Sequence, residues 1–298
     1  MAKRKKKVPT YIQSDFELSA KETYVKSFDD SEIRVLSFVE PKEPKEDIEV
    51  LFVAGLLSVF QRWEKVVKEL NDNYKVHYVE SREKSSSKLV KRAKFKIEDM
   101  REDLAYIEKY LGLDKRKYIT ITSSLAGAMV LENLAKNDLT PIGNIFVSPA
   151  VEVHFPKWTP PMLRILPAFM ITIWKPFIRW WLTKKLEEPE QLQQYIRSVD
   201  EADFAKMRKC VIKNGNRYKG WNILKDVKSR SILVGQTTDK IHETEFSFKV
   251  AKAIPNCTFI DLGTNKAAHD TPLVELTGEF MQELTGARPK LEERIIES

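Results

Sequence analysis

Cysteine is scarce in this chain. Only Cys210 and Cys257 are present, and they stand far apart in the sequence. Two isolated cysteines exclude a disulfide framework and the paired spacing of a zinc site, and they are typical of a reducing compartment. The N-terminus is positively charged but has no apolar run behind it, so the pattern of a secretory signal peptide is absent. We therefore expect a cytoplasmic protein.

Cofactor-binding motifs are also missing. The sequence contains no phosphate-binding P-loop, no dinucleotide-binding glycine motif and no cluster with metal-ligand spacing. We therefore expect chemistry that needs no cofactor and no metal. The net charge is +7, but five positive charges lie within residues 3–7 and the rest of the chain is close to neutral. This distribution predicts a solvated basic tail and no specific nucleic-acid partner.

The composition is that of a soluble globular protein. With 298 residues, 42% of them hydrophobic and 31% charged, the chain can bury a large core, as one α/β domain with an insertion or as two domains. Short apolar runs alternate with helical periodicity, which predicts a mostly parallel, doubly wound sheet. One long helix is expected over residues 89–111. The expected strands cover residues 22–28, 33–39, 48–53, 75–79, 118–122, 144–148, 231–235 and 257–262.

Residues 118–135 combine a strand pattern with a helix pattern and leave no room for a loop between them. The first half is β-branched and aromatic, and the second half has apolar residues at helical spacing. Such a junction forces one residue into a strained conformation, with its side chain exposed above the sheet. A serine at that point lies beside a helix N-terminus, whose N–H groups can stabilise an oxyanion.

This junction resembles the nucleophile elbow of the α/β-hydrolase family. The family has small residues two positions before and two positions after its nucleophile. With Ser124 as the nucleophile, these positions hold Thr122 and Ala126, whereas Ser123 would place Leu125 where a small residue is needed. We therefore predict Ser124 as the nucleophile. The motif reads T-x-S-x-A and lacks both of the glycines that are usual in the family.

The resemblance implies a catalytic triad of serine, acid and histidine in that chain order, each after a strand of the sheet. Ser124 follows one predicted strand, Asp239 follows a later one, and His269 lies after the last. The chain has only four histidines, so finding one in this loop is informative. We predict Asp239 as the acid, with Asp261 and Asp270 as its alternatives.

The resemblance also implies an oxyanion hole made by two backbone N–H groups. The family commonly has His-Gly after the strand that corresponds to residues 48–53, and this chain has Ala54-Gly55 there. Leu56 therefore takes the role of one N–H donor, and Leu125 supplies the other.

No apolar strand is evident between residues 154 and 218, where hydrolases of this family insert a cap. The resemblance implies a core of residues 16–153 and 219–288, a helical cap over 154–218 and a disordered tail over 1–15. Charges and prolines interrupt the apolar stretch of the cap and argue against a transmembrane helix. The cap helices either simply pack on the core or also contact a membrane surface. The predicted substrate-binding residues are Trp158, Phe169, Trp174, Phe177 and Trp181.

These features predict a serine hydrolase, similar to carboxylesterases and lipases, that acts through an acyl-enzyme. The expected substrate is a small hydrophobic ester or thioester. The same triad could transfer its acyl group to an alcohol or thiol, which would make the protein an acyltransferase. An inactive elbow on the same scaffold would instead give a non-catalytic ligand-binding protein. Peripheral membrane association through the cap stays open, and the sequence predicts no oligomeric state.

Overall fold

A single eight-stranded sheet forms the centre of the molecule. The computed structural model describes residues 13–56, 58–152, 158–166, 173, 175–185, 189–237 and 244–295. The strands are β1 (Lys21–Lys26), β2 (Glu32–Ser37), β3 (Glu49–Val53), β4 (Val76–Glu80), β5 (Tyr118–Ser123), β6 (Gly143–Val147), β7 (Ser231–Gly235) and β8 (Cys257–Asp261).

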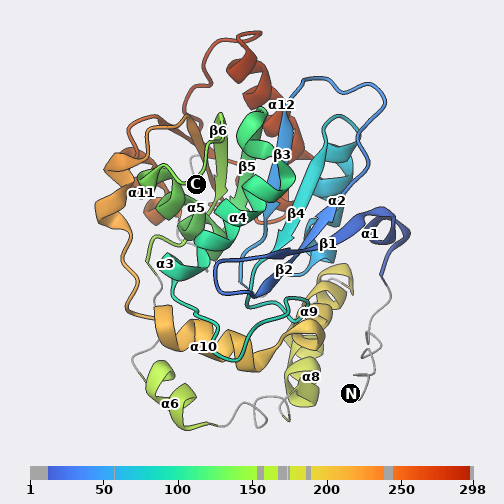
Figure 1. Cartoon of the computed structure of the whole chain (residues 1–298), viewed down its shortest axis with the longest axis vertical. Helices are drawn as coiled ribbons and strands as arrows, with labels where there is room; N and C mark the ends of the chain where they lie inside the picture. Colours follow the sequence, from blue (N-terminus) through green and yellow to red (C-terminus); the bar gives the residue numbers. More distant parts are fainter. Residues whose placement is uncertain are drawn as a thin grey trace.

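The strand order is β1-β2-β4-β3-β5-β6-β7-β8. Strands β3 to β8 pair in parallel, whereas β2 pairs antiparallel with both β1 and β4. Helices lie on both faces of this sheet, as Figure 1 shows. The predicted mostly parallel, doubly wound sheet is confirmed.

The central strands are buried on both faces. In β3, Leu51 and Val53 join one hydrophobic layer, and Val50 and Phe52 join the other. This is why β3 is a continuous apolar run and not an alternating one. The layer that contains Phe52 packs under α1 (Asp15–Ser19), α2 (Phe60–Asn71) and α12 (Thr271–Thr285).

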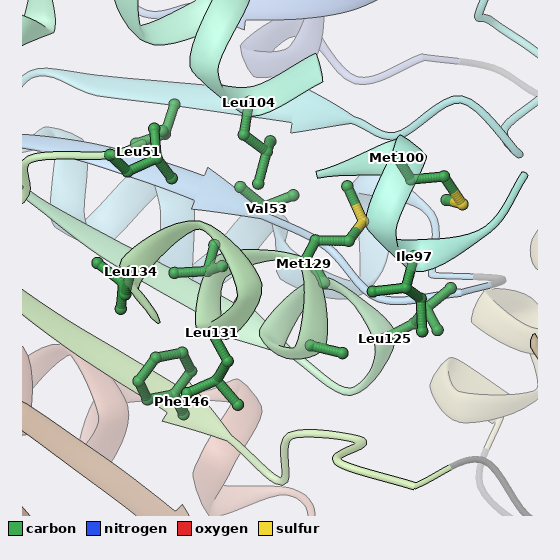
Figure 2. Close-up of a cluster of buried hydrophobic side chains, with 14 of the residues drawn as sticks. Leu51, Val53, Ile97, Met100, Leu104, Leu125, Met129, Leu131, Leu134 and Phe146 are labelled. Carbon is green, nitrogen blue, oxygen red and sulfur yellow. The ribbon is translucent and has the colours of Figure 1, made fainter. Parts of the chain in front are cut away.

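The opposite layer lies under α3 (Ile97–Met100), α4 (Glu102–Leu111), α5 (Leu125–Lys136) and α11 (Thr244–Ala253). Figure 2 shows Leu125, Met129 and Leu134 of α5 in this layer, among side chains from β3, β6, α3 and α4. The short 3-10 helices are η1 (Leu113–Lys115), η2 (Trp221–Asp226) and η3 (Ala267–His269). Because α5 is apolar nearly all round, the residue that begins it is held firmly over the sheet.

The predicted long helix over residues 89–111 is wrong, because α3 begins only at Ile97. Side chains from distant parts of the chain bind the backbone just before it. Asn214 donates to the carbonyl of Phe95 at 2.7 Å and accepts from the N–H of Ile97 at 2.9 Å. Arg82 donates to the carbonyl of Lys94 at 2.8 Å. These bonds replace the bonds that a helix would make, so the segment stays non-helical.

Between β6 and β7 the described residues contribute no strand to the sheet. They form α6 (Thr159–Ile165), α8 (Lys175–Lys185), α9 (Pro189–Glu201) and α10 (Phe204–Asn214), followed by η2. These helices gather at one end of the molecule, at the bottom of Figure 1. We call residues 158–214 the cap segment. Among the helices that the structure describes, none has the length and apolar character that crossing a bilayer requires.

A buried ion-pair network joins the cap segment to the N-terminal helix. Arg197 of α9 is 6% exposed; it donates to Glu17 of α1 at 2.8 Å and also pairs with Glu201. Helix α1 begins at Asp15, inside the segment predicted as a tail, because Ser14 caps it through the N–H of Glu17 at 3.0 Å. The N-terminal helix therefore anchors the cap.

Burial in this network raises the pKa of Glu201 to about 7. The ordinary pKa of the group is 4.5, so between these values the folded protein keeps a proton that the unfolded chain has released. The protonated carboxyl of Glu201 therefore stabilises the folded protein. This contribution to the free energy of unfolding is fully present below pH 4.5 and is lost as the pH rises through about 7.

We expect Arg197→Met to lower the free energy of unfolding by about 3 kcal/mol, because it removes the cation that pairs with the buried Glu201 and one of the two that pair with Glu17. The loss should be greater at pH 8 than at pH 5, since only the ionised Glu201 needs the guanidinium. Urea unfolding at both pH values measures this. Lys249→Met is the control, because its ion pair with Glu245 is exposed to solvent and should leave the unfolding free energy nearly unchanged. Equal effects of the two substitutions would contradict the anchoring role.

Candidate active site

Ser124 occupies the turn between β5 and α5 in a strained backbone conformation. Its φ is +46° and its ψ is −118°, a region that non-glycine residues enter at a cost of about 1–3 kcal/mol. Two hydrogen bonds hold it there. Its N–H donates to the carbonyl of Val147 at 3.1 Å, and its own carbonyl accepts from the N–H of Ala150 at 3.0 Å. Ser123 is the last residue of β5, so the strained position of the elbow is Ser124.

Ser123 has a structural contact instead. Its hydroxyl is buried and accepts a hydrogen bond from the N–H of Gly55 at 2.9 Å. Gly55 lies so close that a Cβ atom there would stand 2.8 Å from the carbonyl oxygen of Ser123 and 3.1 Å from the Cβ of Ser124. The loop after β3 is thus pressed against the elbow, which brings the adjacent Leu56 to the same place.

A lysine side chain from another loop holds this loop in place. The ammonium group of Lys84 donates to the carbonyl of Gly55 and lies 3.2 Å from the carboxylate of Glu83. The carbonyl of Lys84 in turn accepts from Lys206 of α10 at 2.7 Å. The orientation of the Gly55–Leu56 peptide therefore depends on the core and on the cap segment.

A cavity of about 530 Å³ opens over the elbow. Ser124 and His269 both line it, as does Leu56. On the core side, residues at the end of β6 and on α2 also line the cavity. Residues of the cap segment line the other side. The larger apolar side chains of its lining are Trp63, Val147, Ile178, Val199 and Phe204. The structure thus brings together the predicted nucleophile, the predicted base and one predicted oxyanion residue in one mostly apolar cavity.

Hydrogen bonding sets the tautomer of His269. Its Nδ1 atom lies 2.8 Å from the carbonyl oxygen of Asn265. A carbonyl can only accept, so Nδ1 carries the proton and Nε2 is the basic nitrogen of the neutral ring. The ring also stacks on Trp63, with centroids 4.1 Å apart and planes inclined by 30°. The imidazole is therefore held in the tautomer that a general base needs.

Asn265 is fixed in turn by its own side chain. Its amide oxygen accepts from Arg62 of α2 at 2.9 Å, and its amide nitrogen donates to Gln236 at 2.9 Å. Arg62 and Gln236 also line the cavity. The loop that carries His269 is thus tied both to α2 and to the end of β7.

The predicted acid Asp239 lies outside the described residues. Its two alternatives are described, and both have other partners. Asp261 is buried and accepts from the N–H groups of Gly263 at 2.8 Å and Thr237 at 3.2 Å. Asp270 caps α12, and a hydrogen bond from Lys65 lowers the pKa of its carboxyl group. Each of these carboxylates therefore braces a loop beside His269.

Of the five predicted substrate-binding aromatic residues, the three that the structure describes lie outside the cavity. Trp158, Phe177 and Trp181 are 63%, 50% and 47% exposed, and none of them lines the cavity. Phe169 and Trp174 lie outside the described residues. From α8 it is Ile178 that faces the cavity, four residues before the buried Leu182. This i, i+4 pair marks the inner face of α8.

Several site residues were not predicted from the sequence. The main ones are Arg62, Trp63, Lys84 and Asn265. Asn265 stands four residues before His269, a spacing at which a backbone carbonyl and a side chain meet in a helical turn. Trp63 is one of the two aromatic residues, with Phe60, on the buried face of α2. Lys84 carries no comparable signal, because it lies in a polar loop.

Comparisons with known proteins find the same fold. No family model matches the sequence, and no curated protein matches it significantly. A thermophilic esterase from Thermogutta terrifontis with malate bound has a TM-score of 0.71 at 17% identity, over 89% of this chain and 99% of that one. An esterase from Exiguobacterium antarcticum gives 0.67 at 15% identity, over 89% and 100% of the chains. A bromoperoxidase from Bacillus anthracis gives 0.66 at 12% identity, over 88% and 99%.

All three structures are α/β-hydrolase fold proteins. The present chain therefore has the α/β-hydrolase fold, as the elbow motif predicts. These identities are low, so the comparison extends to the fold and not to the activity.

Gly55→Ala tests the close approach of the loop after β3 to the elbow. The added Cβ would push the loop away from Ser123, so an oxyanion donor at Leu56 would be displaced. We expect ester hydrolysis to lose up to about 10²-fold in kcat with little change in KM. Gly278→Ala on α12 is the control, because its Cβ would meet nothing closer than the Tyr74 hydroxyl at 3.7 Å. Full activity of Gly55→Ala would count against this loop as part of the site.

Proposed function

We propose that this protein is a serine hydrolase that cleaves a carboxylic ester or thioester with an apolar acyl group. One observation carries the proposal: Ser124, in its strained conformation, lines the same cavity as His269. A strained, non-glycine residue in a cavity is typical of a functional position. The esterases among the structural neighbours support a hydrolase at the level of the fold.

In the proposed reaction, Nε2 of His269 takes the proton of the Ser124 hydroxyl as its oxygen attacks the substrate carbonyl carbon. The carbonyl π bond breaks, and the oxyanion accepts hydrogen bonds from the N–H groups of Leu56 and Leu125. The tetrahedral intermediate then collapses, and the leaving group takes the proton from His269. A water molecule then gives a proton to Nε2 of His269 as its oxygen attacks the acyl carbon. The bond from that carbon to the Ser124 oxygen breaks, the acid leaves, and His269 returns the proton to Ser124.

The hydrogen bond from Nδ1 to Asn265 supports this role for His269, since it leaves Nε2 basic. The imidazolium that forms also needs a negative charge nearby. We propose Asp239 as that charge, because the carboxylates of Asp261 and Asp270 are engaged elsewhere. Asp239 also follows β7, the strand after which the family carries its acid.

The lining of the cavity supports the proposed substrate class. Ile178, Val199 and Phe204 of the cap segment face the elbow, with Trp63 and Val147 on the core side. No aspartate or glutamate is among the described residues that line this cavity. An acyl chain that leaves water for such walls gains roughly 0.8 kcal/mol for each methylene buried.

Two matched pairs of variants test the triad with p-nitrophenyl butyrate as substrate. Ser124→Ala and Asp239→Asn should each lower kcat by about 10⁴-fold or more, because they remove the nucleophile and the charge that stabilises the imidazolium. Ser123→Ala and Asp270→Asn should keep activity within about tenfold of the parent protein.

Circular dichroism must show that all four variants are folded. An active Ser124→Ala protein would exclude the proposed nucleophile. An inactive Asp270→Asn protein beside a fully active Asp239→Asn protein would show that the other carboxylate serves the histidine.

A series of p-nitrophenyl esters from acetate to octanoate tests the substrate class. Each pair of added methylenes should raise kcat/KM by about tenfold until the cavity is full. Phe204→Ala should flatten this dependence, because it removes part of the apolar wall. Trp158→Ala should leave the slope unchanged, since its side chain lies outside the cavity. A parent protein that prefers acetate to octanoate would contradict an apolar acyl substrate.

A further inference from the structure

Large apolar side chains gather on the outer surface of the cap segment. Ile165 is 83% exposed and Trp180 is 55% exposed, although both are in helices of a folded protein. Monomeric proteins rarely leave so many aromatic and branched side chains in one region without a partner. We call this surface the cap patch. Its members are Trp158, which is the N-cap residue of α6, Met162 and Ile165 on α6, and Phe177, Trp180 and Trp181 on α8.

The exposure of the cap patch does not result from a helix that lacks a packing partner. Helix α8 has a separate inner face, where Leu182 is buried and Ile178 lines the cavity. Lys175 and Arg179 fasten α8 to Asp200 of α9. Helix α8 is therefore already packed on its inner face. Its aromatic residues lie on a second face, which is exposed to solvent.

The charge around the cap patch selects the kind of partner. From position 153 to position 186 the sequence contains none of the chain's 43 acidic residues. Arg164 on α6 and Lys184 on α8 are exposed beside the apolar side chains. A second copy of this chain would bring the same positive charge to the interface and repel. The basic residues of this interval are Lys157, Arg164, Lys175, Arg179, Lys184 and Lys185.

Helices that combine tryptophans, branched apolar residues and cations, with no acids, fit the boundary between lipid headgroups and acyl chains. Tryptophan prefers that level of a bilayer, and arginine and lysine pair with anionic headgroups there. The helices α6 and α8 lie at the same end of the molecule, as Figure 1 shows. Both can therefore meet one surface.

The chain also has a basic stretch near its N-terminus. Residues 3–7 are all basic and stand shortly before α1 in the sequence. Helix α1 is bound to α9 of the cap segment through the ion pair of Glu17 with Arg197. Clustered positive charge of this kind strengthens the attraction to an anionic surface.

We propose that the cap patch docks the protein onto bilayers that contain anionic phospholipid. The patch lies flat in the headgroup region and does not cross the membrane. Ile178 and Trp180 belong to the same helix, so α8 carries the cavity wall on one face and part of the docking surface on another. Docking places the cavity close to amphiphilic molecules in the membrane. The docking itself does not depend on the proposed hydrolase activity.

Co-sedimentation of the full chain with vesicles tests the proposal. The parent protein should bind vesicles of phosphatidylcholine with phosphatidylglycerol at least tenfold more tightly than vesicles of phosphatidylcholine alone, and 0.5 M salt should weaken this binding. The double variant Ile165→Ser, Trp180→Ser should bind the mixed vesicles at least tenfold more weakly. The control double variant Tyr106→Ser, Tyr110→Ser on α4 replaces exposed aromatic residues elsewhere and should bind as the parent does.

A second pair of variants separates charge from apolar contact. Arg164→Gln with Lys184→Gln should reduce the preference for anionic vesicles severalfold. Lys225→Gln with Lys228→Gln, two exposed lysines outside the cap segment, should leave the preference unchanged. Thermal unfolding should confirm that every variant is folded.

Several outcomes would overturn the proposal. These are equal binding to neutral and anionic vesicles, no binding at all, or full binding by the cap-patch variant. A parent dimer that the cap-patch variant converts to a monomer, with no vesicle binding by either, would assign the patch to a second copy of the chain. Ser124→Ala should bind vesicles like the parent. Failure of docking and failure of the hydrolase assignment are therefore separate results.

Discussion

The backbone strain at Ser124 is the constraint on which the rest of the site depends. A turn this sharp brings β5, α5 and the loops after β3 and β6 into van der Waals contact. A Cβ on Gly127 would lie 2.7 Å from the Cβ of Pro149, and a Cβ on Gly55 would lie 2.8 Å from the carbonyl of Ser123. Thr122 and Ala126 stand two residues on either side of Ser124, where α/β-hydrolases usually carry glycines. The need for close approach is met here at Gly55 and Gly127 instead.

The same contacts couple the cap segment to the chemistry that we propose. Lys206 of α10 donates to the carbonyl of Lys84, and the side chain of Lys84 holds the carbonyl of Gly55. Movement of the cap segment would therefore change the orientation of the Gly55–Leu56 peptide. On the other side, Arg62 and Gln236 hold Asn265, whose carbonyl sets the tautomer of His269. The residues that we propose as nucleophile, base and oxyanion loop are each positioned by side chains or backbone groups outside the proposed reacting groups.

Local patterns in the sequence were enough to predict the sheet and the elbow. All eight expected strands are present. The central ones, β3 to β7, are short runs buried on both faces, which requires an apolar composition. The edge strand β1 is mostly exposed and can be recognised by its β-branched and aromatic residues. The strained residue was predictable at Ser124, because the strand and helix patterns meet without a loop. The long helix over residues 89–111 failed for a nonlocal reason: the side chains of Asn214 and Arg82 bind its backbone from distant parts of the chain.

The walls of the cavity were harder to predict than the elbow. The aromatic content of the cap segment suggested substrate contacts, but composition does not reveal which face of a helix turns inward. In α8 the residue at the cavity is Ile178, while Trp181 and Phe177 face outward. The side chain of Lys84 binds the carbonyl of Gly55, and nothing in its polar loop indicates this contact. The backbone carbonyl of Asn265 binds His269, and only the four-residue spacing between the two indicates it. A triad can be inferred from order along the chain, but its bracing residues are found only once the loops are placed.

The most direct test of the central claim is reaction of the purified protein with a fluorophosphonate, followed by mass spectrometry of its peptides. Such a reagent phosphonylates a serine whose hydroxyl is activated by a neighbouring base. We expect one adduct per chain, on the peptide that contains Ser124, and no adduct when His269 is replaced by alanine. An adduct on any other serine, or a folded protein that takes up no reagent, would contradict the claim.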